Sequence, residues 1–143
     1  MLDKLRDFFA APTETVADDD AALHLAAAVL LVEVAKSDHR LEDLELARIE
    51  RVLRQQWDID QDDLNDLIKV AEETAEAHVS LHEHVDRVNG NFSAEQKRAL
   101  IKGLWDVACA DGEIHHYEEL LVRRIADLIY VPHADFIRTK HEA

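Results

Sequence analysis

Two acidic stretches, 73 residues apart, have the residue types and spacing to bind a cation. Each contains a first acid, an Asp five residues later and a Glu seven residues after that Asp. The two sets are Glu33, Asp38 and Glu45, and Asp106, Asp111 and Glu118. Carboxylate oxygens favour Ca²⁺, Mg²⁺ or Mn²⁺ over zinc. The sequence therefore predicts two divalent-metal clusters, with Ca²⁺ as the first expectation.

The two glutamates fall on the apolar sides of predicted helices. The stripe that includes Glu118 consists of Ile114, Tyr117, Leu121, Ile125 and Leu128. The stripe that includes Glu45 consists of Leu41, Leu44, Ile49, Val52 and Leu53. A carboxylate that faces a core is costly unless it is paired, protonated or bound to a metal. Asp106 lies off the main apolar stripe of its helix and is the weakest member of the second set.

A metal-free explanation of the same acids stays open at this stage. The acids can cap helices and pair with buried arginines, for which Arg48, Arg51, Arg123 and Arg124 are available. Asp111, Gly112 and Glu118 match the second half of an EF-hand loop, with Ile114 as the central aliphatic residue. Because the earlier ligand positions hold Val107 and Cys109, a true EF-hand is excluded.

Other chemistry is weakly supported. His78, His82 and His84 have zinc-like spacing, but Ser80 is expected to interrupt their helix, which favours surface histidines. Glu113 and His116 form a single Glu-x-x-His match, whereas di-iron bundles need two such pairs. The single cysteine excludes an internal disulfide and a cysteine zinc site. We find no catalytic-triad, nucleophile-elbow or phosphate-loop spacing, so we expect a protein that is not an enzyme.

The composition predicts an all-α domain. The chain has 143 residues, only 3 Gly and 2 Pro, and a net charge of −15, which disfavours nucleic acid as a partner. The absence of a signal-peptide pattern and of a long apolar run predicts a cytoplasmic protein without a transmembrane segment. The apolar periodicity predicts helices over about 20–37, 41–56, 61–78, 80–90, 94–109 and 115–129, and a short last helix with Phe136 and Ile137.

The helices are expected to form two similar three-helix units. A shift of 73 residues aligns the two acidic sets and also aligns Trp57 with Tyr130. We therefore predict a compact bundle of about seven helices within 20–143, with an internal repeat over about 20–79 and 93–141. Residues 1–11 form a predicted amphipathic helix, with Leu2, Leu5, Phe8 and Phe9 on one side, and residues 12–19 form a linker.

The chain resembles the TerB (tellurite-resistance protein B) family over about residues 20–140. The resemblance rests on Ala110-Asp111-Gly112-Glu113-Ile114, which follows an apolar helix, with Glu118 downstream. It implies a cytoplasmic helical domain with a divalent-metal role in tellurite resistance or a broader stress response, alongside membrane-associated protein partners. Asp111 and Glu118 match the acidic signature of the family, and Asp38 and Glu45 match its first-half counterpart. His39 stands in place of the glycine there, so the first site is expected to bind metal more weakly than the second.

Two hypotheses follow. The first is a metal-binding stress-response protein of the TerB type. The second is a metal-independent, acidic interaction module whose N-terminal helix docks a basic or membrane-associated partner, motivated by the net charge of −15 and the apolar side of residues 1–11.

Overall fold

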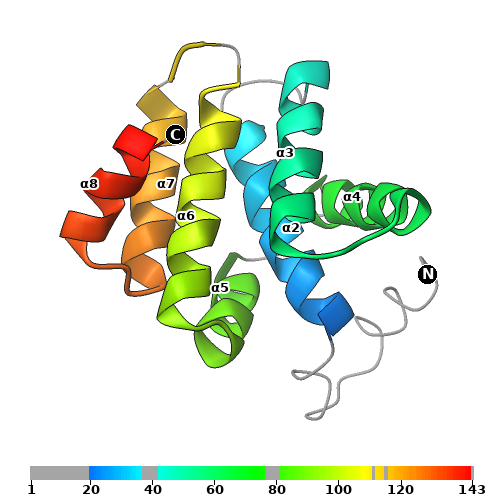
Figure 1. Cartoon of the computed structure of the whole chain (residues 1–143), viewed down its shortest axis with the longest axis horizontal. Helices are drawn as coiled ribbons and strands as arrows, with labels where there is room; N and C mark the ends of the chain where they lie inside the picture. The colour runs from blue at the N-terminus through cyan, green and yellow to red at the C-terminus, as the bar shows by residue number, and fades with distance from the viewer. Residues whose placement is uncertain (1–19, 37–41, 77–80, 111, 115, 143) are drawn as a thin grey trace.

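A computed structural model describes residues 20–36, 42–76, 81–110, 112–114 and 116–142. These residues form seven helices and no strand, which confirms the predicted all-α fold (Figure 1). The helices are α2 (Asp20–Ala35), α3 (Asp43–Gln56), α4 (Gln61–Glu76), α5 (Leu81–Asn91), α6 (Ala94–Ala108), α7 (His116–Leu128) and α8 (His133–Glu142). Their bounds lie within about two residues of the predicted ones. The predicted N-terminal helix and linker lie outside the described residues.

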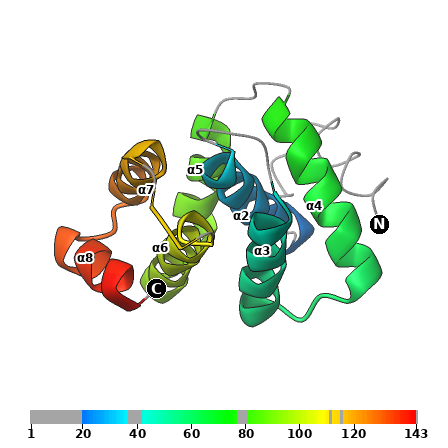
Figure 2. The same ribbon diagram turned by 90° about the horizontal axis from the view of Figure 1, so that it is seen from above.

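Helix α2 is the central element. It contacts α3, α4, α5, α6 and α7, and its residues from Leu25 to Val32 are all buried. A helix that is apolar on every side belongs in the middle of a bundle, because each of its faces needs a packing partner. Figure 2 shows α2 between α4 on one side and α6 on the other, with α7 and α8 beyond α6. The elements that carry the acids are thereby held against one core.

Local sequence signals explain where several helices begin and end. Ser93 and Gln96 form the predicted capping box: the Gln96 backbone N–H donates to Ser93 Oγ (3.1 Å), and the Ser93 backbone N–H donates to Gln96 Oε1 (2.8 Å). Asp60 caps α4 as predicted, because its side chain accepts a hydrogen bond from the Asp63 backbone N–H at 2.9 Å. Tyr130 follows α7 in the left-handed conformation, with a φ of 62°. The Val131 backbone N–H donates a hydrogen bond to the Ala126 carbonyl, which closes the end of the helix.

The predicted apolar stripes are partly wrong. Leu44 is 59% exposed and Tyr117 is 67% exposed, so neither side chain packs in the core. Leu128 is also exposed. The buried residues of α3 are Glu45, Ile49, Val52 and Leu53, and those of α7 are Glu118, Val122, Ile125 and Ala126. Each helix is therefore rotated so that its glutamate, and not the apolar residue before it, faces the interior.

Helix α8 packs on α6 through aromatic side chains. The rings of Trp105 and Phe136 have centroids 5.3 Å apart, and the Arg123 guanidinium lies 5.8 Å from the Phe136 ring. Lys140 Nζ lies 5.4 Å from the Trp105 ring and donates to Glu119 Oε2 at 2.8 Å. These contacts fasten α8 to both α6 and α7. No helix in the described part of the chain is long and apolar enough to cross a bilayer.

Candidate functional site

Glu45 is buried in the first turn of α3, with a relative exposure of 4%. Its burial was predicted and is confirmed. Glu42 precedes the helix as the N-cap, and its backbone N–H donates to Glu45 Oε1 at 3.0 Å. The Glu42 side chain in turn accepts from the backbone of Glu45, which completes a capping box. One carboxylate oxygen of Glu45 therefore has a structural role at the start of α3.

Glu118 occupies the corresponding place in α7. It is the third residue of that helix, as Glu45 is the third residue of α3, and its relative exposure is 1%. A carboxylate at the first turn of a helix also gains from the positive end of the helix dipole. Two of the four buried polar residues in the described part of the chain are therefore glutamates at the same helical position.

Asp106 lies on α6 and is half-buried. Burial raises the pKa of its carboxyl above the ordinary value, while Lys102 on the same helix and Arg48 and Arg51 on α3 oppose the rise. Asp106 therefore sits among cations at the boundary between α3 and α6. The prediction that Asp106 lies outside the apolar stripe of its helix agrees with this intermediate burial.

The remaining predicted ligands are Glu33, Asp38 and Asp111. Glu33 is half-buried near the end of α2. Asp38 and Asp111 lie outside the described residues. Among the residues that the structure does describe, no group of three or more His, Cys, Asp or Glu side chains is arranged to hold a metal ion. Each predicted set therefore has two of its three members among the described residues.

The arginines and histidines differ from expectation. Arg51, Arg123 and Arg124 are exposed and Arg48 is half-buried, so these are not the buried arginines that the metal-free explanation invoked. His84 is fully buried, which makes the prediction of a surface histidine wrong at this position, whereas His82 is exposed as predicted. His78 lies outside the described residues. Burial lowers the pKa of His84, with a smaller opposing effect from Glu83.

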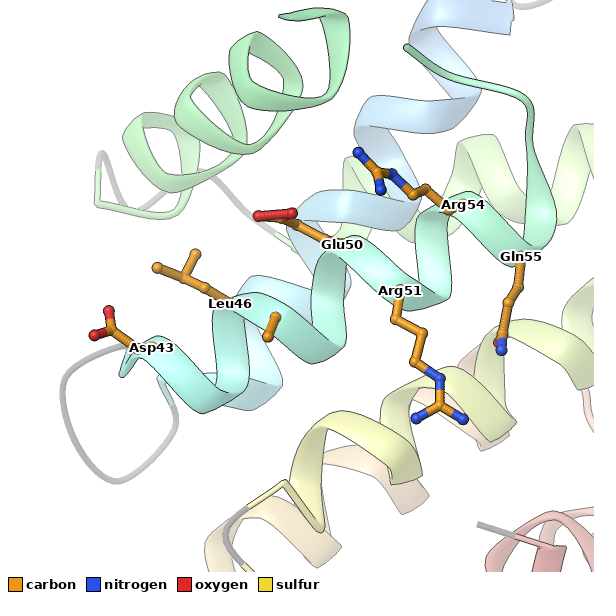
Figure 3. Close-up of a pocket in the computed structure, with 7 residues that line it drawn as sticks. Asp43, Leu46, Glu50, Arg51, Arg54 and Gln55 are labelled. Atoms are coloured by element: carbon orange, nitrogen blue, oxygen red, sulfur yellow. The ribbon is translucent and has the colours of Figure 1, made fainter. Parts of the chain in front are cut away.

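Sequence patterns did not reveal a groove along the outer side of α3. Its volume is about 580 Å³, and it is lined by Asp43, Leu46, Ala47, Glu50, Arg51, Arg54 and Gln55. Figure 3 shows the side chains of Leu46, Glu50 and Arg54 extending to one side of the helix, and those of Arg51 and Gln55 extending to the other. Ala47 falls between these two rows at helical spacing, and its short side chain leaves the hollow. In the sequence, the groove is indicated only by Ala47, a short residue among long ones on the same side of the helix.

A second groove lies between α6 and α8. Its volume is about 240 Å³, and its lining includes Arg98, Lys102 and Arg138. Asp135 lies 3.8 Å from Arg98 Nη1 and 3.6 Å from Arg138 Nη1, so an internal carboxylate already faces the two guanidinium groups.

Comparison with known proteins finds one family that covers most of the chain. No curated protein and no solved structure matches the chain. The family described as "Tellurite resistance protein TerB" matches residues 24–141. The match extends from the second turn of α2 into the last turn of α8 and includes both buried glutamates. The chain therefore belongs to the TerB family of tellurite resistance proteins.

Proposed function

We propose that this TerB-family chain is a non-enzymatic, cytoplasmic stress-response protein that binds divalent cations through its two acidic sets. Ca²⁺ is the first expectation, with Mg²⁺ and Mn²⁺ as alternatives. The partners would be other proteins of the stress response, including membrane-associated ones. The observation that carries the proposal is the burial of Glu45 and Glu118 at the same position of two helices.

The arrangement of the helices supports two equivalent sets. A 73-residue shift carries Asp43, the first residue of α3, onto His116, the first residue of α7. The contacts correspond as well: α2 packs on α3 and α4, while α6 packs on α7 and α8. The contact of α3 with α6 in turn corresponds to the contact of α7 with α2. These pairings support an internal repeat about an approximate twofold axis.

The donor chemistry fits a hard cation. Carboxylate oxygens are the preferred ligands of Ca²⁺, and a Glu in a helix can share a cation with an Asp in the turn before it. Glu118 would supply the helical ligand of the second set, and Asp111 the turn ligand. At the first set, His39 stands in place of the glycine. Gly112 has a φ of +88°, which suits the bend of the second set. We therefore propose that the second set binds more tightly.

Calorimetric titration of the whole chain with Ca²⁺, Mg²⁺, Mn²⁺ and Zn²⁺ tests the proposal. The double substitution Asp111→Asn/Glu118→Gln should abolish the tighter site, and Asp38→Asn/Glu45→Gln should remove only the weaker one. Free metal should also raise the melting temperature of the wild type, because a ligand that binds only the folded state stabilises it.

A matched control separates a metal site from general acidity. The double substitution Asp62→Asn/Glu95→Gln makes the same chemical changes at exposed positions in the first turns of α4 and α6. Metal affinity should stay at the wild-type value in this variant. Absence of binding to the wild type, or equal binding by all the variants, contradicts the proposal.

A metal-independent interaction module is the second candidate, and the surface of α7 favours it. Tyr117 is 67% exposed, Leu120 is 46% exposed, and Tyr130, just beyond the helix, is 78% exposed. Exposed aromatic side chains at one element are typical of protein interfaces. The capping role of Glu45 also accounts for one buried acid without a metal.

Affinity capture from a bacterial lysate separates the two candidates. The double substitution Tyr117→Ser/Leu120→Ser alters only exposed side chains, so the fold and metal affinity should remain intact. An interaction module loses its captured proteins in this variant and keeps them in the presence of a chelator. Loss of the same proteins on chelation alone would instead make metal binding part of the interaction.

A further inference from the structure

The groove along α3 has a candidate occupant within the same chain. We propose that the amphipathic segment formed by residues 2–9 docks in this groove, so that the segment and α3 form an intramolecular contact. The inference is independent of metal binding, because the groove lies on the solvent side of α3 and the buried Glu45 faces the interior.

The position of α2 brings the segment to the groove. His24, in the second turn of α2, has its ring centroid 4.3 Å from that of Trp57, which directly follows α3. The start of α2 therefore lies beside the end of α3. Residues 12–19 can span about 27 Å when extended, whereas the 14 residues of α3 measure about 21 Å. The whole length of the groove is within reach of residues 2–9.

Part of the groove, at the start of α3, is apolar. Leu46 and Ala47 line the groove towards the start of α3, and Leu44, 59% exposed, lies on the same half of the helix. These side chains offer apolar surface to Leu2 and Leu5. A short amphipathic segment of two turns does not persist as a helix in water without a surface to cover it. Burial of its apolar side on α3 would supply the stabilisation.

The charges of the two elements also complement one another. Arg51 and Arg54 line the part of the groove nearer to the end of α3, and guanidinium groups favour contact with aromatic faces such as Phe8 and Phe9. Lys4 and Arg6 flank the apolar side of the segment at helical spacing, where they can meet Asp43 and Glu50. The groove therefore offers the segment apolar side chains at one end and charged side chains of both signs along its walls.

Paramagnetic broadening in NMR spectra tests the contact in the full chain. A nitroxide on Ala10→Cys, in a Cys109→Ala background, should broaden the backbone amide signals of α3 between Leu46 and Gln55. Mixing spin-labelled unenriched chain with unlabelled ¹⁵N-enriched chain should give no broadening, because the contact is intramolecular. Broadening centred on the exposed side chains of α7, broadening only in the mixed sample, or no broadening at all overturns the proposal.

A substitution in the groove provides the matched variant. Ala47→Glu places a charge between the two rows of side chains at an exposed position, so the bundle stays folded while the broadening of α3 is lost. Ala134→Glu makes the same change at an exposed position of α8 and should leave the broadening intact. Circular dichroism confirms that both variants keep their helices. Persistent broadening in Ala47→Glu with full helicity contradicts docking in this groove.

Discussion

Gly103 on α6 and Val52 on α3 lie in direct contact at the crossing of the two helices. A Cβ atom built on Gly103 would lie 2.5 Å from Val52 Cγ1, which is closer than two carbon atoms can approach. Both residues are buried. The absence of a side chain at Gly103 therefore sets how closely α6 approaches α3, and with it the place of Asp106 next to Arg48 and Arg51.

Gly103→Ala should destabilise the protein by about 1–3 kcal/mol, as overpacking of a filled core does. Val52 is β-branched and has little rotamer freedom in a helix, so its methyl group has few ways to move aside. The double variant Gly103→Ala/Val52→Ala should recover part of the loss because the clash is removed. Chemical denaturation followed by circular dichroism measures both changes.

Gly90→Ala is the control for Gly103→Ala. Gly90 is an exposed residue of α5, and a Cβ built on it meets no atom within 4 Å. The substitution should raise the free energy of unfolding by up to about 1 kcal/mol, because alanine favours a helix over glycine. Equal destabilisation by Ala at both glycines would show that the contact with Val52 is not the cause.

The buried His84 should make the protein less stable in mild acid. Its pKa is lowered by burial, so the folded protein keeps the ring neutral at a pH where the unfolded chain already binds a proton. The free energy of unfolding should therefore fall as the pH drops below about 6.5, by at most about 1.4 kcal/mol per pH unit from this residue, until the lower folded pKa is reached. Urea denaturation at a series of pH values measures the slope.

His84→Gln should flatten that slope, although the loss of packing lowers stability at every pH. His82→Gln on the same helix changes an exposed side chain and should leave the slope as it is in the wild type. A slope that remains in His84→Gln and disappears in His82→Gln would assign the pH dependence to His82 and contradict the prediction.

The ion pair between Lys140 and Glu119 should make a small contribution to the free energy of unfolding, and this contribution should depend on pH. The hydrogen bond from Lys140 lowers the pKa of Glu119, so the stabilisation is present above about pH 4.5 and is lost as the pH falls through the folded value. Because both side chains are more than a third exposed, Lys140→Met should cost only about 0.2–1 kcal/mol near neutral pH. Thermal denaturation near pH 7 and near pH 3 measures the difference, with the exposed Lys69→Met as the control.

Asp106 reports whether the second acidic set includes α6. Without metal, burial raises the pKa of its carboxyl, so folding favours the protonated form and stability falls as the pH rises through the raised value. If Asp106 is a ligand, saturating Ca²⁺ should lower this pKa, because a nearby cation stabilises the carboxylate. NMR titration of the Asp106 side chain gives the value in both states. A pKa that is the same with and without bound Ca²⁺ removes Asp106 from the ligand set.

The sequence predicted the architecture because its signals are local and strong. The scarcity of glycine and proline, the apolar periodicity and the caps at Asp60 and Ser93 determine where helices begin and end, and the structure agrees within about two residues. It also predicted the burial of Glu45 and Glu118, because a carboxylate on an apolar stripe is visible from spacing alone.

Only the tertiary structure decided how the helices turn and which faces stay open. Periodicity locates a stripe only approximately, so Leu44 and Tyr117 were placed in a core from which the rotation of α3 and α7 excludes them. The burial of His84 and the groove beside Ala47 likewise depend on which elements pack nearby. The contact of Gly103 with Val52 joins residues 51 positions apart, and local patterns carry no information about such a distant pairing. The sequence by itself determined the helices and the two buried acids, while packing between distant segments decided the surfaces they leave exposed.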